Sequence, residues 1–170
     1  MKIKPTANAK AADADFARLD DYHAQVRAHL DRLASLATRI ENAPLSDEDS
    51  AEACAIEAFF SGSMREHHLI EETSVFPDLL GSGDEELVTL VRTLMQDHGW
   101  IEQNWLEIAP QLRAVAQGHH WIDPAEFQHG AEVFLELSYG HTALEEVVVY
   151  PRARAAAEDA AAAPLAGAAS

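Results

Sequence analysis

The feature that most constrains this chain is a motif that occurs twice, at residues 67–77 and again at residues 141–151. Both copies contain a His, two consecutive Glu residues that begin four positions later, an aromatic residue and a Pro. The His and the first Glu are His67 and Glu71 in one copy, and His141 and Glu145 in the other. A spacing of four residues places two side chains on the same face of an α-helix. The repeat therefore predicts two helices that each present an imidazole beside a carboxylate.

One further His precedes each copy within an apolar helical pattern. His23 lies 44 residues before His67, and His98 lies 43 residues before His141. The chain thus uses one unit, His…His-x-x-x-Glu, twice. We interpret the two units together as a metal site built by four helices.

Apolar residues at alternating intervals of three and four predict four amphipathic helices. We expect them at about residues 13–41, from about residue 50 to a stop at Pro77, at about 85–117, and from Asp123 to Pro151 or shortly beyond. Pro110 lies inside the third pattern and should kink that helix or end it early. Because no segment has a convincing strand pattern, the sequence predicts an all-α fold, an up-down-up-down four-helix bundle with short loops.

The length of 170 residues suits one domain with a substantial core. We expect a flexible N-terminus at residues 1–12, the bundle at 13–152, and an Ala-rich, frayed tail at 153–170. The tail favours helix by composition but carries few bulky apolar residues that could dock.

The strong acidity of the chain narrows its possible partners. Acidic residues number 29 against 12 basic ones, which gives a net charge of −17. Binding to nucleic acid needs clustered Lys and Arg, and so does attraction to an anionic membrane surface. The charge therefore argues against both kinds of partner.

The sequence has no long apolar run, so no transmembrane helix is expected. Its first residues include lysines but no apolar stretch of the kind found in a secretory signal. Cys54 is the single cysteine, which rules out an internal disulfide and suits a reducing compartment. These features predict a cytoplasmic protein.

Helix lengths predict that the four histidines share one level of the bundle. His23 and His67 each lie about 26 Å from the loop that joins their helices, at ~1.5 Å rise per residue. The distances from the shared loop are also similar for His67 and His98, and for His98 and His141. All four also fall in the apolar stripes of their helices, so one buried layer should contain four imidazoles and the carboxylates of Glu71 and Glu145.

A single buried His is usually a hydrogen-bonded core residue, but four of them at matched height are a different case. Burying several ionisable groups without a partner would cost several kcal/mol per ion, roughly, and a bound cation removes that cost. Two histidines with shared carboxylates at each of two ions, the Glu residues bridging, is an arrangement typical of non-haem iron. We predict a dinuclear iron site, with zinc or manganese as the alternatives.

Other polar residues are weaker candidates. Glu102 follows His98 by four residues and could be an additional ligand. His68 and Glu72 lie one position off the buried stripe, so they should either contact a ligand side chain without binding metal or be solvated. The spacing Glu126-x-x-His129 is found in ferritin-like sites, but here it occurs once and far from the His layer. Further expectations are that the ligand imidazoles donate to the carboxylates of Asp97 and Asp20, and that a cavity is lined by Tyr22 and Tyr139.

The pattern of His23, His67-x-x-x-Glu71, His98 and His141-x-x-x-Glu145 resembles that of the hemerythrin-like family of HHE cation-binding domains, over roughly residues 15–152. The resemblance implies a non-haem di-iron centre inside a four-helix bundle, with carboxylate bridges and an oxo or hydroxo bridge. It also implies that the histidines are terminal ligands and that the Glu residues are bridges.

Two departures separate this chain from oxygen-carrying hemerythrins. Those proteins have a His at the position of Glu102, and a His and an Asp five residues apart where this chain has His141 and Glu145. The ligand set is more similar to that of proteins that repair iron centres under nitrosative stress, and to bacterial hemerythrin-like proteins linked to peroxide or nitric oxide.

Three functions follow from this resemblance. The first is a di-iron protein that binds and reacts with peroxide, oxygen or nitric oxide in redox or nitrosative stress defence, with an oxidoreductase activity if it turns over. The second is an oxygen- or iron-sensing or iron-binding module without turnover. The third is a structural or storage site for metal. Turnover of peroxide or nitric oxide separates the first function from the others.

Overall fold

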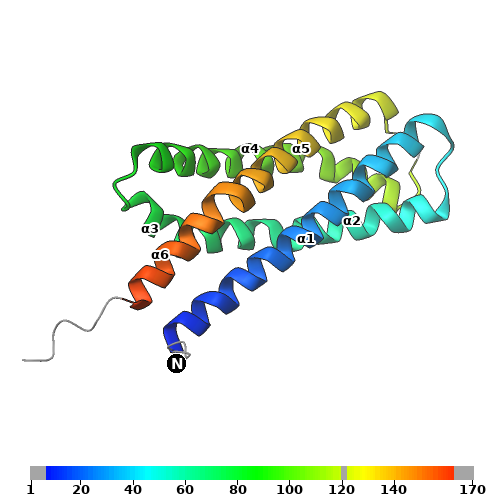
Figure 1. The fold of residues 1–170 in the computed structure, drawn as a ribbon. Coiled ribbons are helices and arrows are strands. Elements are labelled where there is room, and N and C mark those ends of the chain that lie inside the picture. The colour runs from blue at the N-terminus through cyan, green and yellow to red at the C-terminus, as the bar shows by residue number, and fades with distance from the viewer. Residues whose placement is uncertain (1–6, 120–121, 163–170) are drawn as a thin grey trace, which may run out of the picture.

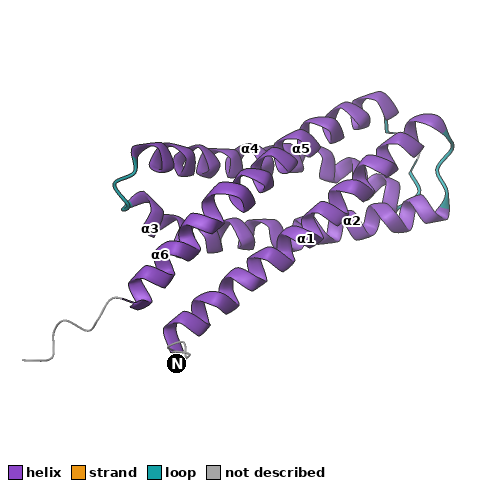
Figure 2. Cartoon of the chain, in the orientation of Figure 1, coloured by secondary structure: helices purple, strands orange, loops and turns teal. Residues whose placement is uncertain are grey.

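A computed structural model describes the backbone of residues 7–119 and 122–162. Four long helices alternate in direction along the chain and pack side by side (Figure 1): α1 (Ala7–Asn42), α2 (Asp47–Ile70), α4 (Glu85–Ala116) and α5 (Pro124–Leu144). Helix α2 continues through η1 (Glu71–Val75) and α3 (Phe76–Leu80), and α5 continues through η2 (Glu145–Val149) and α6 (Tyr150–Ala162). The described residues form helices and loops without a strand (Figure 2), which confirms the predicted all-α four-helix bundle.

Polar side chains fix where three of these helices begin. The Ser46 hydroxyl accepts from the Asp49 backbone N–H, and the Asp49 carboxylate accepts from the Ser46 backbone N–H, which forms a capping box. Asp84 caps α4 by accepting from the Leu87 backbone N–H. Asp123 caps α5, and Pro124 occupies the first helical position as the sequence predicts.

The prediction that Pro77 stops the second helix is wrong, because a π-helical turn carries the chain past it. The Phe76 backbone N–H donates to the Glu71 carbonyl, and the Tyr150 backbone N–H donates to the Glu145 carbonyl. Each bond spans five residues rather than four, and each turn begins at the first Glu of the repeated motif. Pro77 has no backbone N–H and therefore cannot donate the hydrogen bond of a regular α-helix. It lies in the first turn of α3, where that donor is not needed, and α3 continues to Leu80.

Two further boundaries differ from the prediction. Helix α1 begins at Ala7 rather than near residue 13, and α6 extends to Ala162. Helix α6 is docked, since Arg154 pairs with Asp20 at 2.6 Å and lies over the ring of Phe16. Helix α4 agrees with the prediction of about 85–117, since it runs to Ala116 and Pro110 does not end it early. The division into terminus, bundle and tail stays a prediction, because residues 1–6 and 163–170 lie outside the described part.

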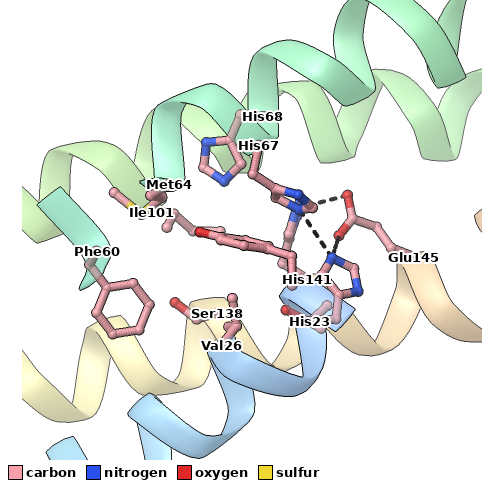
Figure 3. Close-up of a pocket in the computed structure, with 12 residues that line it drawn as sticks. His23, Val26, Phe60, Met64, His67, His68, Ile101, Ser138, His141 and Glu145 are labelled. Carbon is pink, nitrogen blue, oxygen red and sulfur yellow. Dashed lines mark hydrogen bonds and ion pairs between the residues drawn. The ribbon is translucent and has the colours of Figure 1, made fainter. Parts of the chain in front are cut away.

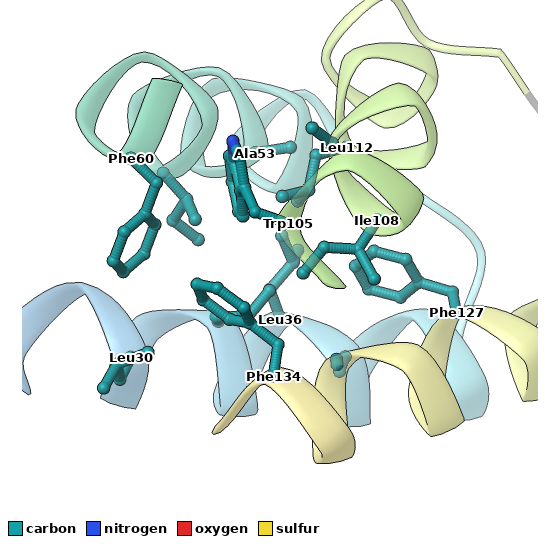
Figure 4. Close-up of a cluster of buried hydrophobic side chains, with 14 of the residues drawn as sticks. Leu30, Leu36, Ala53, Phe60, Trp105, Ile108, Leu112, Phe127 and Phe134 are labelled. Atoms are coloured by element: carbon teal, nitrogen blue, oxygen red, sulfur yellow. The ribbon is translucent and has the colours of Figure 1, made fainter. Parts of the chain in front are cut away.

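Two clusters of buried apolar side chains lie on either side of the predicted His layer. The larger cluster, toward the α1–α2 loop, includes Leu36, Phe60, Trp105 and Phe134 (Figure 4). The smaller cluster lies toward α3 and α6 and includes Phe76, Leu94 and Tyr150. The polar layer is therefore enclosed by apolar packing along the bundle axis. Within the described helices, none is both long enough and apolar enough to cross a membrane.

The close approach of α4 and α5 predicts a specific sensitivity at Gly130. A Cβ added there would lie 2.8 Å from Cγ2 of the buried, β-branched Ile108, which has little freedom to move away. We expect Gly130→Ala to lower the free energy of unfolding by about 1–3 kcal/mol, as overpacking does. The matched control is Gly62→Ala, since a Cβ at Gly62 in α2 meets nothing within 4 Å and should stabilise by about 0.4–1 kcal/mol. Urea denaturation of both variants measures the difference, and equal effects would contradict the packing argument.

Candidate metal centre

The structure brings all six predicted site residues into one buried layer. His23 comes from α1, His67 from the last turn of α2 and His98 from the middle of α4. His141 comes from the last turn of α5, while Glu71 and Glu145 are the first residues of the two π turns. The six side chains are at most 7% exposed, and Figure 3 shows His23, His67, His141 and Glu145 turned toward one another.

One group of potential ligand atoms, which we call the first donor set, consists of His23, His67, Glu71 and Glu145. The Nε2 atoms of His23 and His67 are 3.1 Å apart. His23 Nε2 lies 3.4 Å from Glu145 Oε2, and His67 Nε2 lies 3.3 Å from Glu71 Oε2. Adjacent ligands at about 2.1 Å from one ion lie about 3 Å apart, so these spacings suit a shared metal ion.

The second donor set consists of His98, His141, Glu71 and Glu145. His98 Nε2 lies 3.4 Å from Glu71 Oε2, and His141 Nε2 lies 3.0 Å from Glu145 Oε1. His98 Nε2 is also 3.8 Å from Glu145 Oε1. Both donor sets thus contain the same two carboxylates, with a different pair of histidines on each side.

Several ligand atoms of this layer lack hydrogen-bond partners among the described residues. These atoms are Glu71 Oε2, Glu145 Oε1 and Oε2, His98 Nε2 and His141 Nε2. A buried polar atom without a partner costs about 1–3 kcal/mol, and more if it is charged. A cation bound between these atoms would accept their lone pairs and give each of them a partner, so the residues present fit a metal centre.

Burial and neighbouring charges shift the pKa values of several side chains in the layer. Burial and the nearby Glu145 raise the pKa of Glu71 to about 7. Burial also opposes the charge of Glu145, but the imidazoles of His141, His23 and His98 close beside it hold its pKa well below the usual range. Burial and the neighbouring His23 lower the pKa of His67 to about 3, so its imidazole is neutral. His67 and Glu145 therefore have the neutral and charged forms that metal ligation requires. Burial opposes the charge of His98, but Glu145, Glu71 and Glu72 raise its pKa to about 10, so a metal at the second set would displace its proton.

Outer carboxylates hold the ligand imidazoles in orientation. The His98 Nδ1–H donates to Glu72 Oε1 at 2.7 Å, and His23 Nδ1 lies 3.3 Å from Glu146 Oε1. His141 Nδ1 lies 4.0 Å from Asp97 Oδ2. The hydrogen bond at His98 fixes its tautomer and leaves Nε2 to face the layer. The Nδ1 atoms of His23 and His141 lie near Glu146 and Asp97 without forming a hydrogen bond among the described residues, so the expected bond to Asp97 is not made. The second Glu of each Glu-Glu pair therefore supports a His of the other repeat unit, a role predicted for Glu72 but missed for Glu146.

The comparisons with known proteins agree with this geometry. The family model for the hemerythrin HHE cation-binding domain matches residues 14–153. The chain belongs to this family. No curated protein and no solved structure matches it at a significant level. Membership in a cation-binding family and the His/Glu layer together identify this hemerythrin HHE domain as metal-binding. That the six named residues are the ligands stays a prediction.

His68 and Glu102 form a pair beside the centre of the hemerythrin HHE domain. His68 is buried, its Nδ1 lies 3.1 Å from Glu102 Oε1, and Glu102 also pairs with Arg65 at 3.2 Å. Glu102 is absent from the donor sets, whereas the ligand atoms of His68, His98 and His141 lie within 4.8 Å of one another. The His68 and His98 rings are stacked with centroids 3.9 Å apart and planes 7° apart. Parallel rings cannot direct their lone pairs at one ion, so His68 in this arrangement supports His98.

The expectations for Asp20 and Tyr139 are wrong, because both side chains bond away from the centre. Asp20 pairs with Arg154 rather than with a ligand imidazole. The Tyr139 hydroxyl donates to Asp31 at the surface of the bundle and does not line the cavity beside the centre. Glu126 and His129 are exposed, as expected for a surface pair. Tyr22 does line the cavity beside the centre, and its ring stacks on His67 with centroids 4.1 Å apart.

Tyr150 is the functional candidate that sequence reasoning missed. Its hydroxyl donates to Glu71 Oε1 and lies 3.1 Å from His23 Nε2. The available signal was the repeat itself, since Tyr150 aligns with Phe76 and differs from it by one hydroxyl. Burial and the nearby carboxylates raise the pKa of this tyrosine well above its usual range, so the hydroxyl keeps its proton.

Replacing one imidazole tests the ligand assignment. His98→Ala removes a donor of the second set and leaves Glu71 and Glu145 less well satisfied, so we expect loss of most of the bound metal and a lower melting temperature. The matched control is His129→Ala, which removes an exposed imidazole of α5 and should change neither quantity. Metal content per chain and thermal melting are the measurements. Full metal retention with unchanged melting in His98→Ala would contradict the proposed ligands.

Proposed function

We propose that this hemerythrin HHE domain binds two iron ions, one at each donor set, and reacts with a small oxidant such as peroxide, oxygen or nitric oxide. The observation that carries the proposal is that both donor sets contain Glu71 and Glu145, which can therefore bridge two ions. Two adjacent irons, when bound, supply two electrons and open coordination positions for a small molecule. A role in redox or nitrosative stress defence, in the cytoplasm, would follow from that chemistry.

Ligand counting supports open positions at both ions. Each donor set offers two imidazoles and two shared carboxylates, whereas six-coordinate iron has more positions than these side chains fill. An oxo or hydroxo bridge and a small exogenous molecule could occupy the rest. Zinc or manganese could bind the same residues, because metal selection by imidazole and carboxylate also depends on supply.

A small cavity beside the centre supports a ligand of only a few atoms. The cavity has a volume of about 20 Å³, which is room for one water-sized molecule. Its walls include Val26, Phe60, Met64 and Ile101 from the larger apolar cluster, together with the ligands His23, His67, His141 and Glu145. In this cavity the apolar side chains exclude bulk water, while the ligand imidazoles orient whatever binds between them.

A wider surface groove of about 340 Å³ lies between α1 and α2 and shares two lining residues with the inner cavity. These residues are Tyr22 and His67. The Tyr22 ring stacks on both His67 and Phe59, and its hydroxyl accepts from Ser63 at 3.4 Å. Tyr22 therefore stands between the groove and the cavity, which supports access by a small molecule and exclusion of a large substrate.

The second candidate function is an oxygen- or iron-sensing module without turnover. It is favoured by the direct connection between the centre and the ends of the bundle. Glu145 opens the π turn that leads into α6, and Glu71 opens the turn that leads into α3. Occupancy of the centre could therefore be reported by the position of these short helices. A structural or storage site for metal is the remaining alternative.

Iron loading followed by exposure to oxidants tests the proposed reaction. We expect about two irons per chain and an ultraviolet–visible spectrum that changes on mixing with peroxide or nitric oxide, with repeated consumption of at least one of them. His98→Ala should lose both the iron and the spectral change, whereas His129→Ala should retain them. Binding of two irons without consumption would favour the sensing function. One ion per chain, or zinc alone without a spectral response, would rule out the di-iron redox function.

A further inference from the structure

The internal repeat is broken at one buried position beside the centre. Phe76 and Tyr150 occupy equivalent places in the two copies, and both side chains are almost fully buried. Phe76 stacks on His98 with centroids 5.7 Å apart and planes 17° apart, and Tyr150 stacks on His23 at 5.0 Å and 18°. The two rings therefore stack on equivalent histidines of the two repeat units, and they differ from each other by the hydroxyl of Tyr150.

That hydroxyl reaches only one of the two shared carboxylates. Tyr150 donates to Glu71 Oε1, whereas Glu71 Oε2 makes the contacts with His67 and His98. Because Phe76 has no hydroxyl, its ring offers Glu145 no equivalent hydrogen bond. Both oxygens of Glu145 are consequently without a hydrogen-bond partner in the described part of the chain, whereas Glu71 has only Oε2 in that state.

The two carboxylates face the donor sets in different ways. Glu71 presents the single oxygen Oε2 to both sets, 3.3 Å from His67 Nε2 and 3.4 Å from His98 Nε2. Glu145 divides its oxygens, with Oε2 at 3.4 Å from His23 Nε2 and Oε1 at 3.0 Å from His141 Nε2. The hydroxyl also lies 3.1 Å from a ligand atom of the first donor set, His23 Nε2, and so is closer to one set than to the other.

We infer that Tyr150 is a positioning residue that makes the two metal positions inequivalent, because its hydroxyl holds the outer oxygen of Glu71 and lies beside His23, a histidine of the first donor set. This inference rests on the proposed dinuclear centre. A carboxylate whose outer oxygen accepts a hydrogen bond is a weaker donor and is restrained from rotating. The first position, next to the hydroxyl, therefore differs from the second in its electronic surroundings although the repeat supplies both with the same residue types.

The test compares Tyr150→Phe, which copies the residue of the other repeat, with the unaltered domain. Both proteins are loaded with iron, their iron content is measured, and Mössbauer and visible spectra are recorded. We expect two distinct iron environments in the unaltered domain, which converge toward one in Tyr150→Phe at unchanged iron content. The matched control is Tyr139→Phe, since that hydroxyl bonds Asp31 away from the centre and its removal should leave both environments in place.

A second variant keeps the test decisive if the single change alters folding. Tyr150→Phe combined with Phe76→Tyr moves the hydroxyl to the other repeat, beside Glu145, and two distinct environments should return.

One environment in the unaltered domain, or two unchanged environments in Tyr150→Phe, would overturn the inference. A visible phenolate-to-iron band that Tyr150→Phe removes would also overturn it, because Tyr150 would then be a ligand. Loss of both irons in Tyr150→Phe has the same consequence. Fewer than two irons in the unaltered domain would instead defeat the proposed dinuclear centre.

Discussion

The burial of six titratable side chains in one layer is the constraint on which the rest of this structure depends. Four imidazoles and two carboxylates lie between two apolar clusters, and several of their polar atoms find no hydrogen-bond partner in the described residues. Hydrophobic packing above and below the layer holds the groups together but cannot compensate their desolvation. A cation can, because it is attracted to every inward-facing lone pair at once. The metal-binding function and the stability of the bundle are therefore coupled.

The two π turns show how backbone geometry serves the same layer. Each begins at a shared carboxylate, Glu71 or Glu145, and each is followed by an aromatic residue that stacks on a ligand imidazole and by a Pro. The extra residue in each turn shifts the register between the His-x-x-x-Glu face and the segment beyond it. That shift lets the aromatic ring reach the layer, and π turns of this kind are frequent at functional sites.

Much of the site could be predicted because its signals are local. The spacing of His67 from Glu71 depends only on helical periodicity, and the matched heights of the histidines depend only on residue rise and short loops. Prediction fails where a contact joins segments distant in sequence, as where Asp20 pairs with Arg154 rather than with a ligand imidazole. The error at Pro77 is local instead, because a π turn precedes this residue and the helix continues beyond it. Tyr150 was overlooked because its hydroxyl matters only through its contact with Glu71.

The fold class, the composition of the buried layer and the family can be read from periodicity and repeated spacing, which are properties of the chain alone. The arrangement within the layer depends on how the helices pack. The tertiary structure shows which carboxylate oxygen faces which imidazole, which outer carboxylates orient the ligands, and that one hydroxyl distinguishes the two halves. The physical reason is range: helical pattern acts over three to four residues, whereas hydrogen bonds between helices depend on rotations and rotamers that packing alone selects.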